Sequence, residues 1–261
     1  MQENSVIIKN LRVNYKTIGE GKPFLILHGW GSNSEKWIKI GELLAETRSA
    51  GSGQENYKVI IPDLPGFGKS EEPTNAWSLD NYVDWLLEFS DAVPELKNQF
   101  YIAGHSFGGA LASKFSIKYV QRVSKLFLIS AACVRKRTAI KKIWYRLAKM
   151  FKIFSGLPLY QRARKGFYKY IIKKSDYPYQ SGAMKETYLK IILDDLSYRV
   201  RFIRVPTFII WGDKDESTPI DEARWLNNRI LRSKLIIIDG ADHLLHIKVP
   251  EVLIEKIISN L

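Results

Sequence analysis

Cysteine is almost absent from the 261-residue sequence, in which Cys133 is the one cysteine. A single cysteine cannot form a disulfide within the chain, and disulfide frameworks are typical of proteins from oxidising compartments. The composition therefore excludes a domain that internal disulfides stabilise. We expect a protein of the cytoplasm.

Long apolar runs are absent as well. Residues 1–5 contain neither a basic residue nor an apolar run, so the sequence does not predict a secretory signal peptide. No segment reaches the roughly 18 uncharged apolar residues that a membrane-spanning helix needs. Hydrophobic residues nevertheless make up 46% of the chain, which is enough to bury a core and argues against disorder.

Acidic residues are scarce in one segment of the chain. Residues 133–205 hold 19 Lys and Arg against 4 Asp and Glu, a net charge of +15. The remainder holds 21 against 23, a net charge of −2. The overall charge of +13 therefore belongs to one segment. Because that segment matches no recognition motif, we do not expect nucleic acid as a partner.

Short apolar runs alternate with helical patterns over most of the sequence. The predicted strands cover 6–9, 11–18, 24–27, 57–61, 100–103, 125–129, 206–211 and 235–238. The predicted helices cover 37–48, 79–96, 107–119, 220–229 and 249–261. We expect the first two strands to pair antiparallel. The alternation of strands and helices predicts a mostly parallel sheet of about eight strands with helices on both faces.

The alternation stops between residues 133 and 205. Apolar residues there follow helical spacing, as at Ile140, Ile143, Trp144 and Leu147, while basic residues occupy the other faces. We therefore expect a core formed by residues 1–132 and 206–261, interrupted by a basic helical lid over residues 133–205.

A candidate nucleophile lies between a predicted strand and a predicted helix. The sequence Gly104-His105-Ser106-Phe107-Gly108 matches G-x-S-x-G in the strand–turn–helix context that this motif requires. Glycine is needed on both sides because the turn is tight, and the turn presents the Ser106 hydroxyl at the end of the sheet. Many α/β proteins have a glycine-rich turn at such a place, so the context carries the prediction rather than the motif alone.

The loop after an earlier strand supplies candidate donors for an oxyanion. His28-Gly29-Trp30-Gly31 follows the strand predicted over 24–27. Acyl transfer develops a negative oxygen that two N–H groups can stabilise. We expect the backbone N–H groups of Trp30 and Phe107 to be these donors. By itself, His-Gly-x-Gly would be interpreted as an ordinary turn.

A serine hydroxyl needs a base, and the base needs an orienting group. Of the four histidines, His28 and His105 lie inside the two motifs above, which leaves His243 and His246. His243 lies in the loop after the last predicted strand, where this kind of sheet places chemistry, whereas His246 is expected to pack or cap. Three candidate acids follow an earlier strand: Asp213, Asp215 and Glu216.

Five motifs, in this order along the chain, resemble those of the α/β-hydrolase fold superfamily. They are H-G-x-G at 28–31, D-x-x-G-x-G-x-S at 63–70, G-H-S-x-G-G at 104–109, W-G-x-x-D-x-x-x-P at 211–219 and G-x-x-H at 240–243. The resemblance covers nearly the whole chain and implies the α/β-hydrolase fold. It also implies that Asp215 is the acid of a Ser106–His243–Asp215 triad, that Asp213 structures its loop, and that no cofactor is required.

Two patterns resemble ligand sites that we do not expect. Residues 66–70 end like a phosphate-binding loop, but Asp63 stands where that motif requires glycine. His243 and His246 have the spacing of metal ligands, but no Cys or further His lies near them in the sequence to complete a zinc site.

The expected activity is hydrolysis of a carboxylic ester through an acyl-enzyme. A lactonase or a hydrolase of carbon–carbon bonds would use the same triad, and a non-catalytic binding protein could keep the same fold. The partner is expected to be a small ester or acyl molecule. The basic lid is either a solvated cover over the acyl pocket or a docking surface for an acidic carrier protein or an anionic membrane surface.

Overall fold

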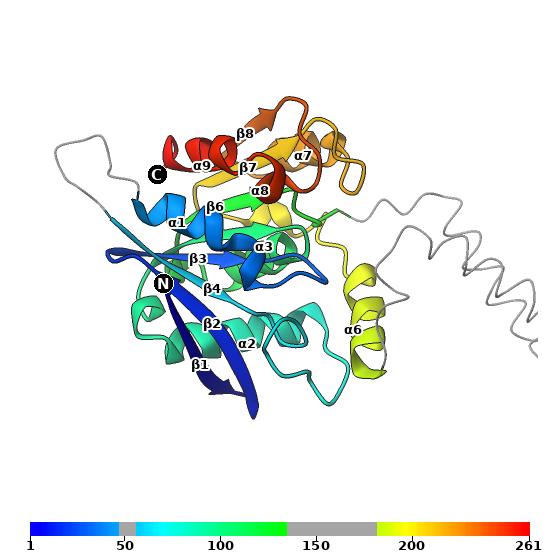
Figure 1. Cartoon of the computed structure of the whole chain (residues 1–261). Coiled ribbons are helices and arrows are strands. Elements are labelled where there is room, and N and C mark those ends of the chain that lie inside the picture. The colour runs from blue at the N-terminus through cyan, green and yellow to red at the C-terminus, as the bar shows by residue number, and fades with distance from the viewer. Residues whose placement is uncertain (47–55, 135–181) are drawn as a thin grey trace, which may run out of the picture.

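The computed structural model of the chain describes residues 1–46, 56–134 and 182–261. These residues form one eight-stranded sheet with helices on both faces (Figure 1). The strands are β1 (Gln2–Ile8), β2 (Leu11–Ile18), β3 (Lys22–Leu27), β4 (Tyr57–Pro62), β5 (Phe100–His105), β6 (Val123–Ile129), β7 (Thr207–Gly212) and β8 (Ser233–Ile238).

The described helices include one in each of the five ranges that the sequence predicts outside the lid. They are α1 (Ile38–Glu46), α2 (Leu79–Ala92), α3 (Phe107–Lys118), α6 (Gly182–Leu193), α7 (Ile220–Asn227), α8 (Leu245–Lys248) and α9 (Pro250–Ile258). Short 3-10 turns are η1 (Ser34–Trp37), η2 (Pro94–Leu96), η3 (Val120–Arg122) and η6 (Val200–Phe202). None of the helices in the described ranges is long and apolar enough to cross a membrane.

The strand order is β1-β2-β4-β3-β5-β6-β7-β8. The pairs β1–β2 and β2–β4 are antiparallel, and every other neighbouring pair is parallel. The predicted antiparallel opening and the mostly parallel sheet are both confirmed. Because β5 lies in the middle of the sheet, the segment that follows it begins at the centre of the carboxyl-terminal edge, where ligands bind in such sheets.

Alternate residues of the central strands pack into two separate apolar layers. In β3, Leu25 and Leu27 face the layer that contains residues of α2, α3 and α7, whereas Phe24 and Ile26 face the layer of α1 and α9. Both layers are needed because these strands are apolar on both faces. The sheet is therefore packed on both faces, and its edge holds the connecting loops in fixed positions.

Helix α2 shows one correct and one incorrect prediction. Ser78 caps its start, since its Oγ accepts the N–H of Asn81 at 3.3 Å while the Asn81 side chain accepts the N–H of Ser78 at 2.8 Å. The helix ends at Ala92, however, and not at Leu96 as the apolar spacing predicts. Pro94 is the reason, because the residue before a proline disfavours helical backbone and Val93 is extended there.

Only part of the predicted lid lies within the described residues. Residues 135–181, including the helical pattern around Trp144, lie outside them. In the described part, Met184 and Ile191 of α6 are buried in the apolar layer of α2 and α3. Leu196, Val200 and Ile203 are buried in the same layer. This end of the insertion is therefore attached to the sheet by apolar packing.

Candidate active site

Ser106 occupies a strained turn between β5 and α3. Its backbone has φ 51° and ψ −114°, a conformation that residues with a side chain rarely adopt. A Cβ at Gly104 would lie 2.3 Å from the carbonyl oxygen of Gly108, and a Cβ at Gly108 would lie 2.3 Å from that of Leu27. The prediction that both positions need glycine is confirmed.

Backbone hydrogen bonds hold this turn in place. The Ser106 N–H donates to the carbonyl of Ile129 at 3.1 Å, and the Ser106 carbonyl accepts from Ala132 at 2.9 Å and from Gly109 at 3.0 Å. Strain of this kind costs about 1–3 kcal/mol and persists only where the surroundings enforce it. The turn thus fixes the half-buried Ser106 at the carboxyl-terminal edge of the sheet.

Asp215 and His243 form a hydrogen-bonded pair at the same edge. Asp215 follows β7 and His243 follows β8, and Oδ2 of Asp215 lies 2.8 Å from Nδ1 of His243. The Asp215 side chain is fully buried, and its Oδ1 accepts the N–H groups of Ser217 at 2.9 Å and Thr218 at 2.8 Å. The Thr218 hydroxyl donates to Oδ2 at 2.8 Å. The carboxylate is therefore held in one orientation.

Burial raises the pKa of Asp215, but the hydrogen bonds from His243 and from the Thr218 N–H outweigh it and hold this pKa below its usual value. The carboxylate stays ionised at neutral pH and accepts a hydrogen from Nδ1 of His243. That bond leaves Nε2 of His243 as the nitrogen able to take a proton.

The other candidate acids and the other candidate base occupy different places. Oδ1 of Asp213 accepts the N–H of Gly240 at 2.6 Å, which ties the loop after β7 to the loop after β8. Glu216 is exposed. His246 is buried and its ring stacks on Trp37, with 4.2 Å between centroids. Asp213 thus structures a loop and His246 packs, as the sequence predicts.

The loop that carries His243, residues 239–244, lies beside the serine turn and is called the base loop below. The ring centroids of His243 and His105 are 4.7 Å apart, and Nε2 of His105 lies 2.8 Å from the backbone carbonyl oxygen of His243. His105 directly precedes Ser106 in the chain. The structure therefore brings the predicted nucleophile, base and acid to one region of the sheet edge.

The two predicted oxyanion donors border the same turn. A Cβ at Gly29 would lie 3.3 Å from Cβ of Ser106, and the rings of Trp30 and Phe107 are 5.4 Å apart. Within the described residues, neither the N–H of Trp30 nor that of Phe107 donates a hydrogen bond. Both groups are thus available to an oxygen that develops negative charge near Ser106.

These features can be compared with known proteins. The sequence profile described as the alpha/beta hydrolase fold matches residues 22–154, which is half of the chain. The chain belongs to the α/β-hydrolase fold family. The expected fold is therefore confirmed.

Two relatives and one solved structure show what this α/β hydrolase is similar to. Lipase 3 of Moraxella sp. (strain TA144) is 25% identical over 245 residues, which are 85% of this chain and 72% of the lipase. A pimeloyl-[acyl-carrier protein] methyl ester esterase of Aeromonas hydrophila is 25% identical over 95% of this chain and 98% of its own. The crystal structure of the serine hydrolase CarC, involved in carbazole degradation, has a TM-score of 0.74 at 23% identity and covers 99% of this chain and 97% of CarC.

The loop over residues 63–70 is structural in this hydrolase. The Oδ1 atom of Asp63 accepts the N–H of Ser34 at 2.6 Å, and its Oδ2 accepts that of Lys69 at 2.9 Å. The Ser70 hydroxyl donates to the Asp63 carbonyl at 2.6 Å. These groups are bound to one another, which agrees with our interpretation of the segment as a turn and not as a phosphate loop.

His243 and His246, which have the spacing of metal ligands, do not form a metal site together. Nδ1 of His243 is bound to Asp215, and His246 stacks on Trp37. Among the described residues, no three His, Cys, Asp or Glu side chains are grouped to hold a metal ion. Cys133 is buried beside Ser113, with 3.2 Å between Sγ and Oγ, and serves as a small core residue.

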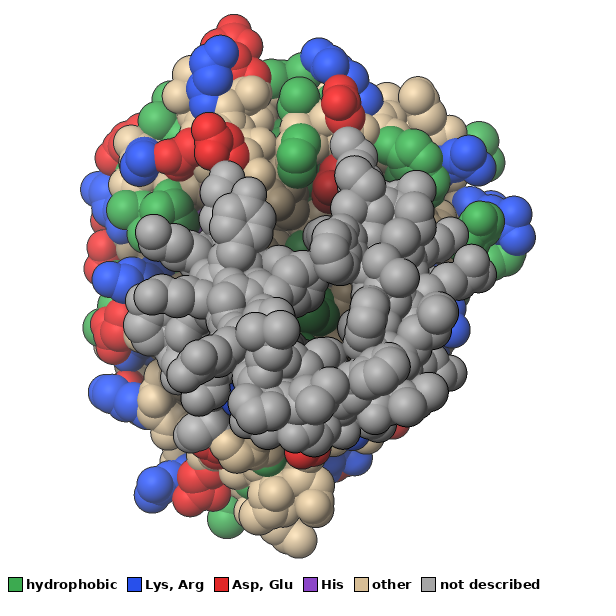
Figure 2. All heavy atoms as spheres, turned by 90° about the vertical axis from the view of Figure 1, so that its right-hand side faces the viewer, with side chains coloured by type: hydrophobic (Ala, Val, Ile, Leu, Met, Phe, Trp, Pro, Cys, Tyr) green, Lys and Arg blue, Asp and Glu red, His purple; other side chains and the backbone are tan. Residues whose placement is uncertain are grey.

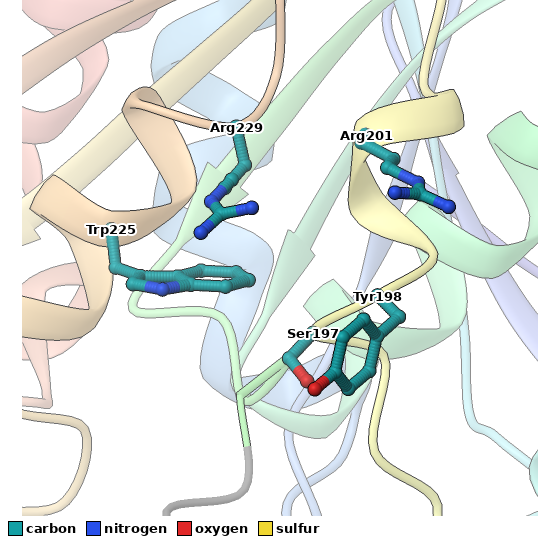
Figure 3. A pocket seen from close by; sticks show the side chains of 5 residues that line it. All are labelled: Ser197, Tyr198, Arg201, Trp225 and Arg229. Carbon is teal, nitrogen blue, oxygen red and sulfur yellow. The ribbon is translucent and has the colours of Figure 1, made fainter.

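A shallow hollow lies between α7 and the segment that leads into η6 (Figure 3). Its walls are formed by Ser197, Tyr198, Arg201, Trp225 and Arg229. The Arg229 guanidinium lies over the Trp225 ring at 5.1 Å, whereas Arg201 extends away from both. None of the predicted catalytic residues lines the hollow, and its two guanidinium groups do not converge on one point.

Two contributors to the site have no clear signal in the sequence. Thr218 donates to Asp215, and His105 donates to the loop of His243. Thr218 lies in the motif at 211–219 and His105 in the motif at 104–109, but a motif does not say which distant group a side chain contacts. The basic residues from Arg135 to Lys149 of the predicted lid, which are either part of a solvated cover or of a docking surface, lie outside the described residues.

Proposed function

We propose that this α/β hydrolase cleaves carboxylic esters through an acyl-enzyme, with Ser106 as nucleophile, His243 as general base and Asp215 as the orienting acid. The observation that carries the proposal is the 2.8 Å hydrogen bond between Asp215 and His243, located beside a strained, partly exposed serine. A buried ionised carboxylate on Nδ1 is the arrangement that a serine–histidine pair needs.

In the proposed first step, Oγ of Ser106 attacks the ester carbonyl carbon while Nε2 of His243 takes the hydroxyl proton. The carbonyl oxygen becomes negative and accepts the N–H groups of Trp30 and Phe107. Asp215 stabilises the imidazolium without taking its proton. His243 then returns the proton to the departing alkoxide, so an alcohol leaves and an acyl-Ser106 remains.

In the second step a water molecule replaces the alcohol. His243 takes a proton from the water as its oxygen attacks the acyl carbon, and the same N–H groups receive the new oxyanion. Collapse of this intermediate returns the proton to Oγ of Ser106 and releases a carboxylic acid. No step requires a metal or an organic cofactor.

The names of the relatives support an ester as the substrate, because a lipase and a methyl ester esterase both cleave esters. Lactone or carbon–carbon bond hydrolysis would use the same groups on a different substrate. A non-catalytic binding protein of the same fold is the remaining alternative. It is disfavoured by the two uncommitted N–H groups and the ordered acid–base pair, which binding alone does not need.

The test combines covalent labelling with a substrate panel. A fluorophosphonate should attach once, to the peptide that contains Ser106, and p-nitrophenyl esters of graded chain length should be hydrolysed. Ser106→Ala should abolish both while the melting temperature is kept, because triad residues act as a unit. Labelling elsewhere would refute the nucleophile. A labelled enzyme that cleaves lactones or β-diketones but no ester would refute the ester assignment.

A further inference from the structure

His105 connects the strand of the nucleophile to the loop of the base. Its Nε2 lies 2.8 Å from the backbone carbonyl oxygen of His243. A carbonyl oxygen can only accept, so Nε2 of His105 carries a hydrogen and Nδ1 is the unprotonated nitrogen. The side chain is 4% exposed. This contact is therefore a buried, directional bond from β5 to the base loop.

Other hydrogen bonds connect the base loop to the loop after β7, which carries Asp215. The Gly240 N–H donates to Oδ1 of Asp213 at 2.6 Å, and the Ala241 carbonyl accepts the N–H of Lys214 at 2.9 Å. These bonds fix the loop relative to β7 but not relative to the serine. In the part of the chain that the structure describes, His105 supplies the one hydrogen bond between residues 239–244 and either β5 or Ser106.

His105 is itself held firmly. It is the last residue of β5 and pairs with Ile129 of β6. Its ring lies 4.7 Å from that of His246 and 5.8 Å from that of Trp37. Burial, followed by the charge that His246 and His243 would carry, holds the pKa of His105 well below its usual value. The ring is therefore neutral at ordinary pH and keeps its hydrogen on one nitrogen.

We propose that His105 is a positioning residue that sets the distance between His243 and Ser106, an inference that rests on the proposed function. A general base must lie within hydrogen-bond reach of the proton it removes. Asp215 fixes the orientation of the His243 ring, and His105 fixes the backbone that carries the ring. Displacement of a reacting group by about 1 Å can cost about 100-fold in rate.

Two substitutions test this role, and both place a side-chain amide at position 105. In His105→Gln the amide nitrogen lies close to the place of Nε2 and can still donate, whereas in His105→Asn it lies nearer the place of Nδ1 and cannot reach the His243 carbonyl. We expect His105→Gln to keep kcat within about threefold, and His105→Asn to lower kcat by about 10- to 100-fold with KM changed less than about twofold. Equal kcat in the two variants would overturn the proposal.

His246→Phe is the matched control. It changes a second buried histidine of the same cluster, whose Nδ1 has no hydrogen-bond partner among the described residues. Packing is altered but no link to β5 is lost, so kcat should stay within a few-fold of the wild type. A loss as large as that of His105→Asn would show that the cluster matters only as packing.

A double-mutant cycle separates positioning from general damage. If His105 acts through His243, His105→Asn should cause no further loss of the residual rate in a His243→Ala background. The same fold-loss in both backgrounds would overturn the proposal. Histidine ¹⁵N NMR of the wild type tests the bond without any variant, so it applies even if His105→Asn fails to fold. The Nδ1–H tautomer of His105 would overturn the proposal.

Different experimental results would refute the role of His105 and the proposed function. A wild type that neither reacts with fluorophosphonate nor loses turnover with Ser106→Ala would refute the proposed function. A wild type that is labelled and active, but whose two amide variants have the same kcat, would refute only the role of His105.

Discussion

Asp213 and Asp215 are two residues apart at the end of β7, yet their environments differ. Asp215 is buried against His243 and Thr218, whereas Asp213 accepts the N–H of Gly240. In Asp215→Asn the amide favours the wrong His243 tautomer, so kcat should fall by about 10⁴-fold. Asp213→Asn should cost less than about tenfold. Rates on a p-nitrophenyl ester decide this, and a larger loss from Asp213→Asn would contradict the assignment.

The backbone at Ser106 leads to a second prediction. At φ 51° and ψ −114° only glycine is free of steric cost. Ser106→Gly should abolish activity and raise the free energy of unfolding by about 1 kcal/mol, because it removes that cost. Ser106→Ala keeps a Cβ, so it should abolish activity without this gain. Urea unfolding of the two variants measures the difference, and equal stabilities would show that the turn is not strained.

Three buried histidines make stability depend on pH, and His105, whose pKa burial holds well below its usual value, is one of them. Burial lowers the pKa of His246 from 6.5 to about 4, and burial also lowers the pKa of His28 from 6.5 to about 4. Below pH 6.5 the unfolded chain therefore binds protons at these histidines that the folded chain does not bind. Stability is fully present above that pH and should decline steadily as the pH falls toward about 4.

The midpoint of urea unfolding, measured across this pH window, checks the decline. His246→Phe removes one of these three groups and should flatten the pH dependence. If the variant and the wild type show the same slope, His246 does not remain neutral in the folded protein.

At the scale of elements, Lys114 of α3 joins two other parts of the fold. Its Nζ lies 2.9 Å from Asp80 of α2 and 2.8 Å from Asp194, just beyond α6, and its side chain is 7% exposed. Lys114→Met would leave the partly buried Asp194 without its cation. We expect a loss of about 1–3 kcal/mol in the free energy of unfolding, below the range for fully buried pairs because Asp80 is exposed.

Lys118→Met is the control on the same helix. Lys118 also pairs with an aspartate of α2, Asp84, at 2.7 Å, but both side chains are about half exposed. Removing an exposed pair should cost less than about 1 kcal/mol. Similar losses from the two variants in urea unfolding would show that Lys114 does not anchor α6 to the core.

The elements differ in how well the sequence predicts them. The bounds predicted for β2 agree with the structure because the strand lies between clear turn residues, whereas the end of α2 is misplaced because the apolar spacing continues past Pro94. For the site, the strand ends indicate where chemistry lies, but residues alone leave Asp213, Asp215 and Glu216 open. The bond between His105 and His243 spans 138 positions and depends on strand register, which no local pattern encodes.

For the whole molecule, the positive charge is concentrated in one segment of the chain. Residues 135–181 hold 14 Lys and Arg against one acidic residue, a net charge of +13, so the remaining 26 basic and 26 acidic residues balance. On the face shown in Figure 2, acidic and basic side chains of the described residues are interspersed around the rim. The excess of positive charge therefore belongs to the basic segment.

We propose an acidic carrier protein or an anionic membrane surface as the partner of this segment. Wild-type protein should bind an acidic carrier protein or vesicles rich in anionic lipid at low salt, with about 1 kcal/mol from each basic residue near a lipid surface. Binding should weaken, and its salt dependence should flatten, when five residues are changed to Gln. These residues are Arg135, Lys136, Lys141, Lys142 and Lys149.

A control with the same charge change uses exposed residues from the balanced part of the chain. These are Lys9, Lys39, Lys97, Arg232 and Lys234. This variant should keep most of the binding, and both variants should hydrolyse a small neutral ester at the wild-type rate. If the wild type binds neither probe at low salt, the basic segment has no charged partner and serves only as a solvated part of the lid.

The strand order has a consequence for the protein during its own synthesis. The proposed nucleophile follows β5, whereas its proposed acid and base follow β7 and β8, the last two strands of the sheet. Synthesis runs from the amino terminus, and a domain generally folds as a unit. A nascent chain therefore contains Ser106 before His243 has been translated, and before β7 and β8 can complete the sheet. If the proposed triad carries the activity, no turnover can begin before residue 243 has been translated, so the strand order itself delays the first turnover.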